Sequence, residues 1–385
     1  MTSIAIFWIA LGLVAYAYAG FPLLLWLRAR LLPRPHLEAD VTPAVSVIIA
    51  AYNEEQSIAA KLENVLAVDY PSDQREILVV SDGSDNRTCE TVRRFAERGV
   101  RLLQRPREGK AMALNAAVAQ AQGEVLVFSD ANSMFARHTL RALVRPFADP
   151  CVGGVAGNQC YEKFLGQAAT ASGEKSYWSL DRWTKSLQSQ AGSVTSATGS
   201  LYAIRKRLFM PVVAGVTDDF ATSTTVILQC HRLVFAQEAV AYEPVAASAG
   251  VEFGRKVRIM TRGFRGVLLR RSLLNPFQFG FYSLQLFSHK LLRRLVIFPL
   301  LAMLLVSPWL WHQAVPYKFA VAAQLATYGC AALGVLLGRT RFRNSKLLSL
   351  PLFLCVANAA SLVAVFNLLR GHRVVLWQPQ RGAVT

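Results

Sequence analysis

Acidic residues are scarce in this chain of 385 residues: 24 aspartates and glutamates stand against 42 lysines and arginines, which leaves a formal net charge of +18. Charged residues of both signs make up only 17% of the sequence, whereas 53% of it is hydrophobic. The mean hydropathy of +0.30 is too high for an ordinary soluble enzyme, and the apolar excess lies at the two ends of the chain. This composition predicts a membrane protein with a soluble middle part.

Cysteine motifs are missing as well. The six cysteines form no CxxC pair and no spacing typical of a metal site, which excludes a zinc ribbon and a disulfide framework. Cys330 and Cys355 lie in apolar segments, so reduced thiols in a cytoplasmic domain and a membrane are the simplest interpretation. The sequence also contains no internal repeat and no low-complexity segment.

The basic residues stand beside the apolar segments. Arg28, Arg30 and Arg34 follow the first apolar run, and further basic residues crowd into 255–271, 290–294 and 339–346. Flanks of this kind mark the cytoplasmic ends of membrane helices and suit anionic lipid. A nucleic-acid-binding protein is the alternative for so basic a chain, and strong salt-dependent binding to DNA would support it. The placement of the charges favours the membrane.

The apolar runs predict the membrane segments. Residues 4–27 carry no charge and would form about 36 Å of helix, enough to cross a bilayer. Because no basic residue precedes this run, we expect a retained span rather than a cleaved signal peptide. Three more candidate spans are 295–311, 319–337 and 347–369. Two amphipathic helices on the membrane surface are expected at 255–271 and 273–292.

The soluble middle part alternates strands with helices. Buried-strand runs at 45–51, 76–80 and 125–128 each end in acids or amides, and helical patterns follow them. This alternation predicts an α/β fold with a doubly wound parallel sheet, whose ligands bind at the carboxyl ends of the strands. The expected domains are a transmembrane helix at 1–30, a cytoplasmic catalytic domain at 40–250, interfacial helices at 251–292, transmembrane helices at 293–370 and a tail at 371–385.

Two acidic stretches carry the expected chemistry. Asp130 and Asn132 follow the strand at 125–128, and their oxygens are hard ligands suited to Mg²⁺ or Mn²⁺ carrying phosphates. The alternative is an Asx-rich turn that closes the strand. Asp218 and Asp219 open a predicted helix, where capping is the plain interpretation.

Six stretches in order resemble the membrane members of glycosyltransferase family 2, which are related to cellulose, hyaluronan and chitooligosaccharide synthases. They are VSVIIAAYNEE, EILVVSDGSD, REGKAMALNAA, GEVLVFSDANS, TGSLYAIR and VTDDF. The resemblance covers roughly residues 45–258 and the flanking membrane helices. It implies a GT-A fold, in which a Rossmann-like sheet binds a nucleotide sugar, usually through a divalent metal.

The resemblance implies a role for each residue at the nucleotide. Tyr52 would stack on the base, and Glu54 would approach the ribose or base. Asp82 matches the acid that accepts a hydrogen bond from uracil, which implies a UDP-sugar donor. Lys110 would offset the negative charge of the nucleotide, and Arg258 would hold the diphosphate. The alternatives are that Tyr52 is a buried hydrophobic residue, that Glu54 caps the next helix and that Lys110 is a solvated lysine.

The resemblance also implies the metal ligands and the catalytic base. Asp130 and Asn132 stand at the DxD position, where the amide brings no net charge and weakens metal affinity. Asp219 matches the base that takes a proton from the acceptor hydroxyl in an inverting transfer. Asp218 stands in place of the usual glutamate, and its like charge should raise the basicity of the pair.

One family motif is incomplete. Processive members carry QxxRW before the interfacial helix, and residues 255–259 here read RKVRI, which keep the arginine but lack the glutamine and the tryptophan. That tryptophan is expected at the acceptor sugar, so acceptor binding and processivity are in question. Tyr177, Trp178 or Trp183 would be substitutes, unless they pack in the core.

We therefore expect a membrane-bound inverting glycosyltransferase that moves a sugar from a UDP-sugar to a lipid-linked or saccharide acceptor. Exopolysaccharide or glycolipid assembly in a bacterial inner membrane is the expected setting. The alternatives are a processive synthase that translocates its product and a non-catalytic scaffold of a synthase complex. The candidate protein partners are a second copy of the chain, in a homo-oligomer, and other subunits of a synthase complex. Arg370, Arg373 and Arg381 after the last span favour a cytoplasmic C-terminus.

Overall fold

The computed structural model describes residues 1–161, 170–243, 249–337 and 345–372. Its centre is an eight-stranded sheet with the order β3-β2-β1-β4-β7-β6-β8-β5. The strands of the first half are β1 (Val45–Ala51), β2 (Arg75–Asp82), β3 (Val100–Arg105) and β4 (Val125–Asp130). These four are parallel to one another, as the sequence predicts.

The second half of the sheet is mixed rather than parallel. Its strands are β5 (Met134–Phe135), β6 (Val152–Tyr161), β7 (Tyr202–Arg205) and β8 (Arg232–Glu243). The strand β7 runs antiparallel to both β4 and β6, and the two-residue β5 runs antiparallel to β8. Because β7 runs opposite to β4, its first residue, Tyr202, pairs with Phe128 near the carboxyl end of β4. The turn that precedes β7 is thereby placed beside Asp130.

The central strands are buried on both faces, and each face has its own apolar core. All seven residues of β1 are buried. Val47 and Ile49 point into one core, which the helices α3 (Ile58–Leu66) and α6 (Thr139–Val144) complete. Ile48 and Ala50 point into the other core, with α5 (Lys110–Gln120) and α9 (Thr225–Leu228). Successive side chains of a strand point into the two cores in turn, and this is the reason that the strand sequences are apolar throughout.

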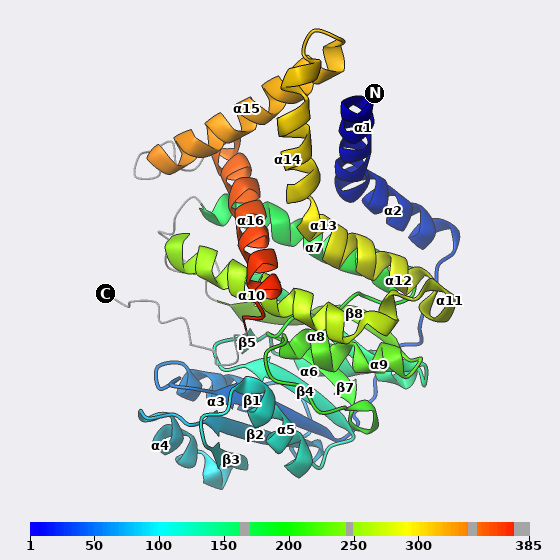
Figure 1. Ribbon diagram of the computed structural model, residues 1–385. Coiled ribbons are helices and arrows are strands. Elements are labelled where there is room, and N and C mark those ends of the chain that lie inside the picture. Colours follow the sequence, from blue (N-terminus) through cyan, green and yellow to red (C-terminus); the bar gives the residue numbers. More distant parts are fainter. Residues whose placement is uncertain (162–169, 244–248, 338–344, 373–385) are drawn as a thin grey trace.

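The second core joins the sheet to the membrane part of the molecule. It includes Val267 of α10 (Ala249–Leu269), Leu273 of η6 (Arg271–Leu274) and Tyr282 of α12 (Phe281–Gln285). Figure 1 shows α10 and α7 (Thr170–Ala191) between the sheet and the long apolar helices. The sheet and the helices from α10 onward therefore share one set of buried apolar side chains, which makes their relative position part of the fold.

Three helical segments among the described residues are long and apolar enough to cross a membrane: Thr2–Leu31, Val315–Leu336 and Lys346–Leu369. The first comprises α1 (Thr2–Ala15), η1 (Tyr16–Gly20) and α2 (Phe21–Leu31), and the other two are α15 and α16. A fourth candidate is the pair Phe281–Leu295 and Ile297–Leu310, which is bent by 47°. The pair contains η7 (Leu286–Leu292), α13 (Arg293–Leu295), α14 (Ile297–Val306) and η8 (Pro308–Leu310).

The segment 273–292 differs from the single surface helix that the sequence predicts. It is broken into η6, α11 (Pro276–Phe279), α12 and η7. Pro276 starts α11 and has no backbone N–H, and Gly280 takes a φ of 56°, which favours glycine. The second part of the segment, from Phe281 onward, belongs to the bent pair of apolar helices.

Candidate active site

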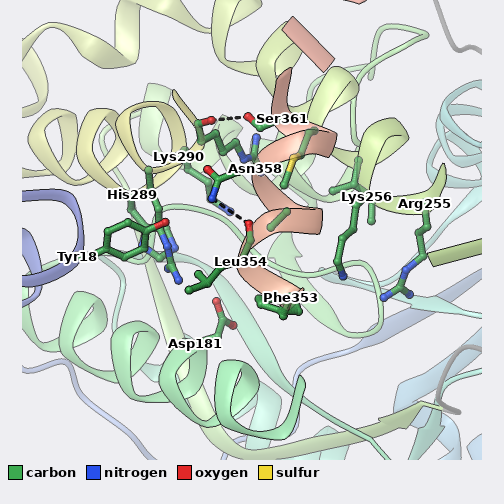
Figure 2. Close-up of a pocket in the computed structure, with 15 residues that line it drawn as sticks. Tyr18, Asp181, Arg255, Lys256, His289, Lys290, Phe353, Leu354, Asn358 and Ser361 are labelled. Carbon is green, nitrogen blue, oxygen red and sulfur yellow. Dashed lines mark hydrogen bonds between the residues drawn. The ribbon is translucent and has the colours of Figure 1, made fainter. Parts of the chain in front are cut away.

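A cavity of about 420 Å³ lies at the carboxyl ends of β1 and β4. Its lining includes the end of β4 (Asp130 to Asn132), the turn at 196–200 before β7, and the start of α8 (Asp218–Ser223). Residues of α10 close it on the side that faces the membrane helices. We call this space the catalytic cavity. A second cavity, of about 250 Å³, adjoins it toward the apolar helices (Figure 2).

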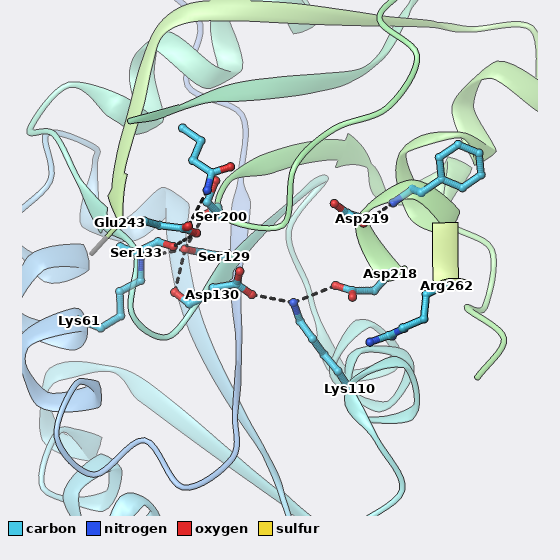
Figure 3. Close-up of polar contacts among 12 residues, drawn as sticks. Lys61, Lys110, Ser129, Asp130, Ser133, Ser200, Asp218, Asp219, Glu243 and Arg262 are labelled. Atoms are coloured by element: carbon cyan, nitrogen blue, oxygen red, sulfur yellow. Dashed lines mark hydrogen bonds and ion pairs between the residues drawn. The ribbon is translucent and has the colours of Figure 1, made fainter. Parts of the chain in front are cut away.

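Lys110 links the two acidic stretches that the sequence singled out. Its ammonium Nζ lies 2.6 Å from Oδ1 of Asp130 and 2.9 Å from Oδ2 of Asp218 (Figure 3). It is the first residue of α5, after Gly109, whose φ of 97° favours glycine. Burial opposes the charge of Lys110, but Asp130 and Asp218 outweigh it and hold the pKa of the ammonium well above its usual value.

The two adjacent acids of α8 have opposite electrostatic environments. Burial would raise the pKa of Asp218, but Lys110 and Arg262 outweigh burial and hold that pKa below its usual value. For Asp219, burial and the charge of Asp218 raise the pKa to about 6. Oδ1 of Asp219 accepts a hydrogen bond from the backbone N–H of Phe220 at 2.7 Å. Two neighbouring carboxyl groups whose pKa values are pushed apart are typical of an acid–base site.

Arg262 also positions α8. Its guanidinium is buried and donates from Nε to the carbonyl of Val216 at 3.0 Å, with a second hydrogen bond from Nη2 to the same oxygen at 2.5 Å. The loop before Asp218 is thus held by a residue on α10. Arg255 and Arg258 of the same helix line the catalytic cavity, and the predicted contact of Arg258 with a diphosphate stays a prediction.

A buried lysine supports the end of β4, and sequence analysis missed it. The Lys61 side chain has no exposed surface, and its Nζ donates to Oγ of Ser129 at 2.8 Å and to the carbonyl of Ser133. It also lies 3.6 Å from the centre of the Phe135 ring. Burial lowers the pKa of Lys61 to about 7. A signal existed, because Lys61 shares the apolar face of the α3 sequence with Ile58, Leu62 and Val65.

Glu243 is a second residue that sequence analysis missed. It ends β8, lines the catalytic cavity, and accepts hydrogen bonds from Oγ of Ser133 at 3.0 Å and from Nε2 of Gln159 at 2.5 Å. Burial and the nearby charge of Asp130 raise its pKa to about 7. Burial also raises the pKa of Glu54, and Asp130 adds to the rise. Carboxyl groups therefore accumulate around Asp130.

This accumulation fits a divalent cation. Asp130 and Asn132 both line the catalytic cavity, and the Asn132 side chain is exposed to it. Among the described residues, no group of three His, Cys, Asp or Glu side chains is placed to hold a metal by itself. Mg²⁺-type sites commonly use one or two protein oxygens and complete the shell with phosphates and water. The residues present match that kind of donor set.

Of the residues predicted at the ribose and base, Tyr52 and Asp82 lie outside the lining of the catalytic cavity, whereas Glu54 lines it. Asp82 is fully buried, and its Oδ1 accepts from the backbone N–H groups of Glu108 and Gly109, both at 2.9 Å. Arg107 pairs with Asp82 at 3.2 Å, and its guanidinium lies 3.0 Å from the centre of the Tyr52 ring. In this structure Asp82 holds the loop that leads to Lys110.

The position of the missing tryptophan is occupied by Ile259, which is 42% exposed and lines the catalytic cavity. Trp183 on α7 is also 42% exposed, and it is not among the lining residues. The side chains of Tyr177 and Trp178 lie outside the described residues. Within the described part of the chain, neither position 259 nor Trp183 places an aromatic ring in the catalytic cavity, and the aromatic residue that lines it, Phe220, is buried.

Comparisons with known proteins point to the same part of the chain. Residues 46–212 match the family model described as glycosyl transferase family 2. A poly-beta-1,6-N-acetyl-D-glucosamine synthase of Staphylococcus aureus (strain COL) is 29% identical over 255 residues, which cover 63% of this chain and 60% of the synthase. The synthase of Staphylococcus epidermidis is 27% identical over 245 residues, which cover 60% of this chain and 57% of that protein. The chain thus spans about three fifths of the length of the curated relatives it matches, given the 60% coverage of the first.

A solved structure resembles nearly the whole chain. It is the mannosyltransferase PcManGT of Pyrobaculum calidifontis in complex with GDP-Man and Mn²⁺. The TM-score is 0.68 and the sequence identity is 25%, and the match covers 96% of this chain and 100% of that one. The similarity therefore includes the membrane-facing helices as well as the sheet.

Proposed function

We propose that this chain transfers a sugar with inversion from a nucleoside diphosphate sugar to a lipid-linked or saccharide acceptor. The chain is a glycosyltransferase with a family 2 domain of the GT-A fold. The family model and the solved structure confirm the GT-A fold and the glycosyltransferase class that the sequence predicts. The observation that carries the proposal is the convergence of Asp130, Lys110 and the acid pair Asp218–Asp219 in one cavity.

The proposed base is Asp219. With a pKa near 6, its carboxylate is largely ionised at neutral pH and is basic enough to accept a proton. The oxygen of the acceptor hydroxyl attacks the anomeric carbon while its proton passes to Asp219. The bond between that carbon and the diphosphate oxygen breaks on the opposite face, and the electron pair leaves with the diphosphate. Inversion follows from this in-line geometry.

The proposed role of Asp218 differs from that of its neighbour. Its carboxylate pairs with Lys110 at 2.9 Å, so it keeps the ammonium inside the cavity and raises the basicity of Asp219. Lys110 and Arg258 then supply positive charge for the departing diphosphate. Asp130 and Asn132 would hold a Mg²⁺ or Mn²⁺ ion, which offsets the diphosphate charge when bound. Glu54 lines the cavity and is proposed to approach the donor there.

The finer assignments rest on the resemblance and on the relatives. A UDP-sugar is the proposed donor because Asp82 and Tyr52 match the family's base-binding residues. Exopolysaccharide or glycolipid assembly in a bacterial inner membrane is the proposed setting, because the curated relatives are poly-beta-1,6-N-acetyl-D-glucosamine synthases and three described helices could cross a membrane. Partners in a synthase complex or a second copy of the chain belong to the same proposal.

The deciding experiment measures nucleotide release by the purified full-length protein in lipid nanodiscs. UDP-GlcNAc, UDP-glucose and GDP-mannose are each supplied with a membrane lipid extract as the acceptor source, with Mn²⁺, with Mg²⁺ or with excess EDTA. We expect release from one UDP-sugar, loss of release in EDTA, and recovery when the metal is returned. Release from GDP-mannose alone would overturn the UDP assignment, and full activity in EDTA would overturn the metal site. The absence of release from every donor would favour the scaffold alternative.

A further inference from the structure

The second cavity lies where the catalytic domain meets the apolar helices. It is bounded by α7, α10, the η7–α13 segment, α16 and Tyr18 of the first apolar helix (Figure 2). Its volume is about 250 Å³. We call it the interfacial cavity. None of the roles assigned above uses it.

The charge of the interfacial cavity is strongly positive. Among the described residues, Asp181 is the one carboxylate that lines it. Five lysines and arginines line it as well: Arg255, Lys256, Lys290, Arg293 and Arg294. The Asp181 carboxylate already lies 2.9 Å from Nζ of Lys185 on the same helix. So many cations around one small space repel one another and favour the binding of an anion there.

The apolar part of the lining comes from α10 and α16. Ile259 and Met260 come from α10, and Phe353, Leu354 and Ala357 come from α16, which is a candidate span. Basic pockets between membrane helices bind the anionic head groups of lipids. A cavity with a cationic part and an apolar wall next to a membrane span matches an amphiphile that has a phosphate head and a hydrocarbon tail.

The lining fits a neutral sugar chain less well. Tyr18 and Phe353 are its aromatic residues apart from His289. Two of its uncharged polar groups are engaged within the protein, because Nδ2 of Asn358 donates to the carbonyl of Leu354 at 2.9 Å and Oγ of Ser361 donates to the carbonyl of Arg294. Sugar sites depend on stacking faces and available hydrogen-bond groups, whereas charge dominates here.

The interfacial cavity adjoins the catalytic cavity. Both are lined by Asp181, Arg255, Ile259, Lys290 and Arg294. Lys290 lies near enough to Asp219 that its charge acts on that carboxyl group and opposes the rise in the pKa of Asp219. A molecule anchored in the interfacial cavity can therefore extend toward the proposed base.

We propose that the interfacial cavity binds the phosphate or diphosphate group of the membrane lipid that carries the acceptor. This proposal rests on the proposed glycosyl transfer and names its acceptor class. The lipid tail leaves along α16, and the anionic group is held by Lys256, Arg293 and Arg294. The acceptor hydroxyl beyond the phosphate then reaches Asp219.

The test uses farnesyl phosphate as the probe and measures its direct binding to the full-length protein in phosphatidylcholine nanodiscs, without donor. The variant is Lys256→Gln with Arg293→Gln, because these two residues line the interfacial cavity and not the catalytic cavity. We expect the Kd for farnesyl phosphate to rise about tenfold or more, the scale of losing one charge-assisted hydrogen bond. Arg271→Gln, at an exposed arginine of η6, is the matched control and should leave the Kd unchanged.

A second variant separates folding from binding. Ala357→Phe adds a large side chain to the wall on α16 without changing any charge, and we expect it to weaken farnesyl phosphate binding as well. Farnesol and inorganic phosphate, each alone, should bind at least about tenfold more weakly than farnesyl phosphate, because each lacks one half of the amphiphile. Equal binding of farnesol, or equal binding in all variants, overturns the proposal.

Two further arms identify the source of the phosphate. Nanodiscs that contain phosphatidylglycerol should compete only weakly with farnesyl phosphate, and full competition would assign the cavity to bulk lipid instead of an acceptor. Nucleotide binding should be the same in all variants. Because farnesyl phosphate binding is measured without donor, its failure is distinct from a failure of the transfer reaction to release nucleotide.

Discussion

At the scale of single residues, the site is organised by the two ion pairs of Lys110. The ammonium lies between Asp130 and Asp218 and favours the ionised form of Asp218. Asp219 takes its hydrogen bond from a backbone N–H instead, so burial and its charged neighbour raise its pKa. Two identical side chains next to each other in sequence thereby acquire different properties.

The first prediction concerns the replacement of the base. Asp219→Asn should keep donor binding and lower the rate of transfer by roughly a hundredfold or more, the usual scale for losing a general base. Nucleotide binding and release are measured on the same preparation. Asp73→Asn, at an exposed aspartate of η2 (Ser72–Gln74), is the control and should have normal activity. Near-normal turnover of Asp219→Asn would rule out the assignment.

The second prediction concerns pH. The pKa of Asp219 is raised to about 6, so the carboxylate is ionised above that pH and protonated below it. As the pH falls below about 6, kcat/KM should decrease by about tenfold per pH unit, and it should level off above about 7. The profile of transfer is compared with the pH dependence of donor binding. A flat profile down to pH 4.5 would contradict the assignment.

At the scale of elements, the backbone between α5 and β4 packs closely against the start of β1. Gly123 lies between them, and its N–H donates to Oγ of Ser46 at 2.8 Å. A Cβ at Gly123 would lie 2.5 Å from the backbone nitrogen of Ser46 and 2.6 Å from the carbonyl carbon of Val45. The start of β1 therefore leaves no space for a side chain there.

The third prediction follows from this contact. Gly123→Ala should reduce the free energy of unfolding by about 1–3 kcal/mol, because backbone atoms must move to admit the methyl group. The change appears as a lower Tm in detergent. Gly254→Ala is the matched control, since nothing lies within 4 Å of a Cβ at that helical position, and it should leave the Tm unchanged or raise it slightly. An unchanged Tm for Gly123→Ala would show that β1 can shift at no cost.

The helix α10 combines two tasks that the sequence suggested separately. One set of its residues faces the apolar helix α16, where Lys256 lies 5.1 Å from the centre of the Phe353 ring. Another set reaches the site, where Arg262 holds the loop before α8. The helix that the sequence predicts at the membrane surface is thus also a wall of the catalytic cavity.

At the scale of the whole molecule, the direction of α16 bears on topology. Figure 1 shows α1 beginning far from the sheet and α16 running back toward it, so that α16 ends beside α10. Arg370 follows directly after this end. With the catalytic domain in the cytoplasm, the end of α16 would lie on the cytoplasmic side, which agrees with the basic residues there.

The fourth prediction tests that arrangement. A single cysteine added after Thr385, in a variant without the native cysteines, should resist an impermeant thiol reagent on intact cells and react after the cells are opened. A cysteine placed at Thr2, at the start of α1, is the control and should react from outside. Efficient labelling of the C-terminal cysteine on intact cells would place it outside and contradict the prediction.

The fifth prediction concerns product length. A processive enzyme must hold the new chain end while the nucleotide is exchanged, and an aromatic face provides such a grip. Ile259 occupies the position of the family's tryptophan and cannot stack in this way. We expect one sugar, or a few, to be added per acceptor, and mass spectrometry of the product from one labelled UDP-sugar measures this. A ladder that reaches long polymer would favour the processive synthase.

A companion variant makes the same point in the other direction. Ile259→Trp should lengthen the product if the missing stacking face limits processivity, because the side chain is 42% exposed and lines the catalytic cavity. Ile6→Trp, at a 40% exposed isoleucine of the first apolar helix, is a matched control that should leave the product length unchanged. Equal product lengths for the two variants would show that residue 259 does not limit processivity.

The sequence by itself determined the parallel half of the sheet, the family resemblance and the ends of the strands where chemistry is placed. The sequence assigned roles to Asp130, Asp218, Asp219, Lys110 and Arg258, and all five line one cavity, while the roles themselves stay predictions. These features are local: an apolar run reports a buried strand, and a motif reports the residues that follow it. The six ordered stretches carried this information without any knowledge of packing.

Only the tertiary structure decided which groups meet across the sheet. Lys61 and Glu243 come from α3 and β8 and both flank Asp130, and no local pattern pairs elements so distant in sequence. The opposite pKa shifts of Asp218 and Asp219 depend on burial and on Lys110, which are properties of the packed state. The interfacial cavity likewise exists only because separate helices bring their cations to one place, where desolvation and charge act together.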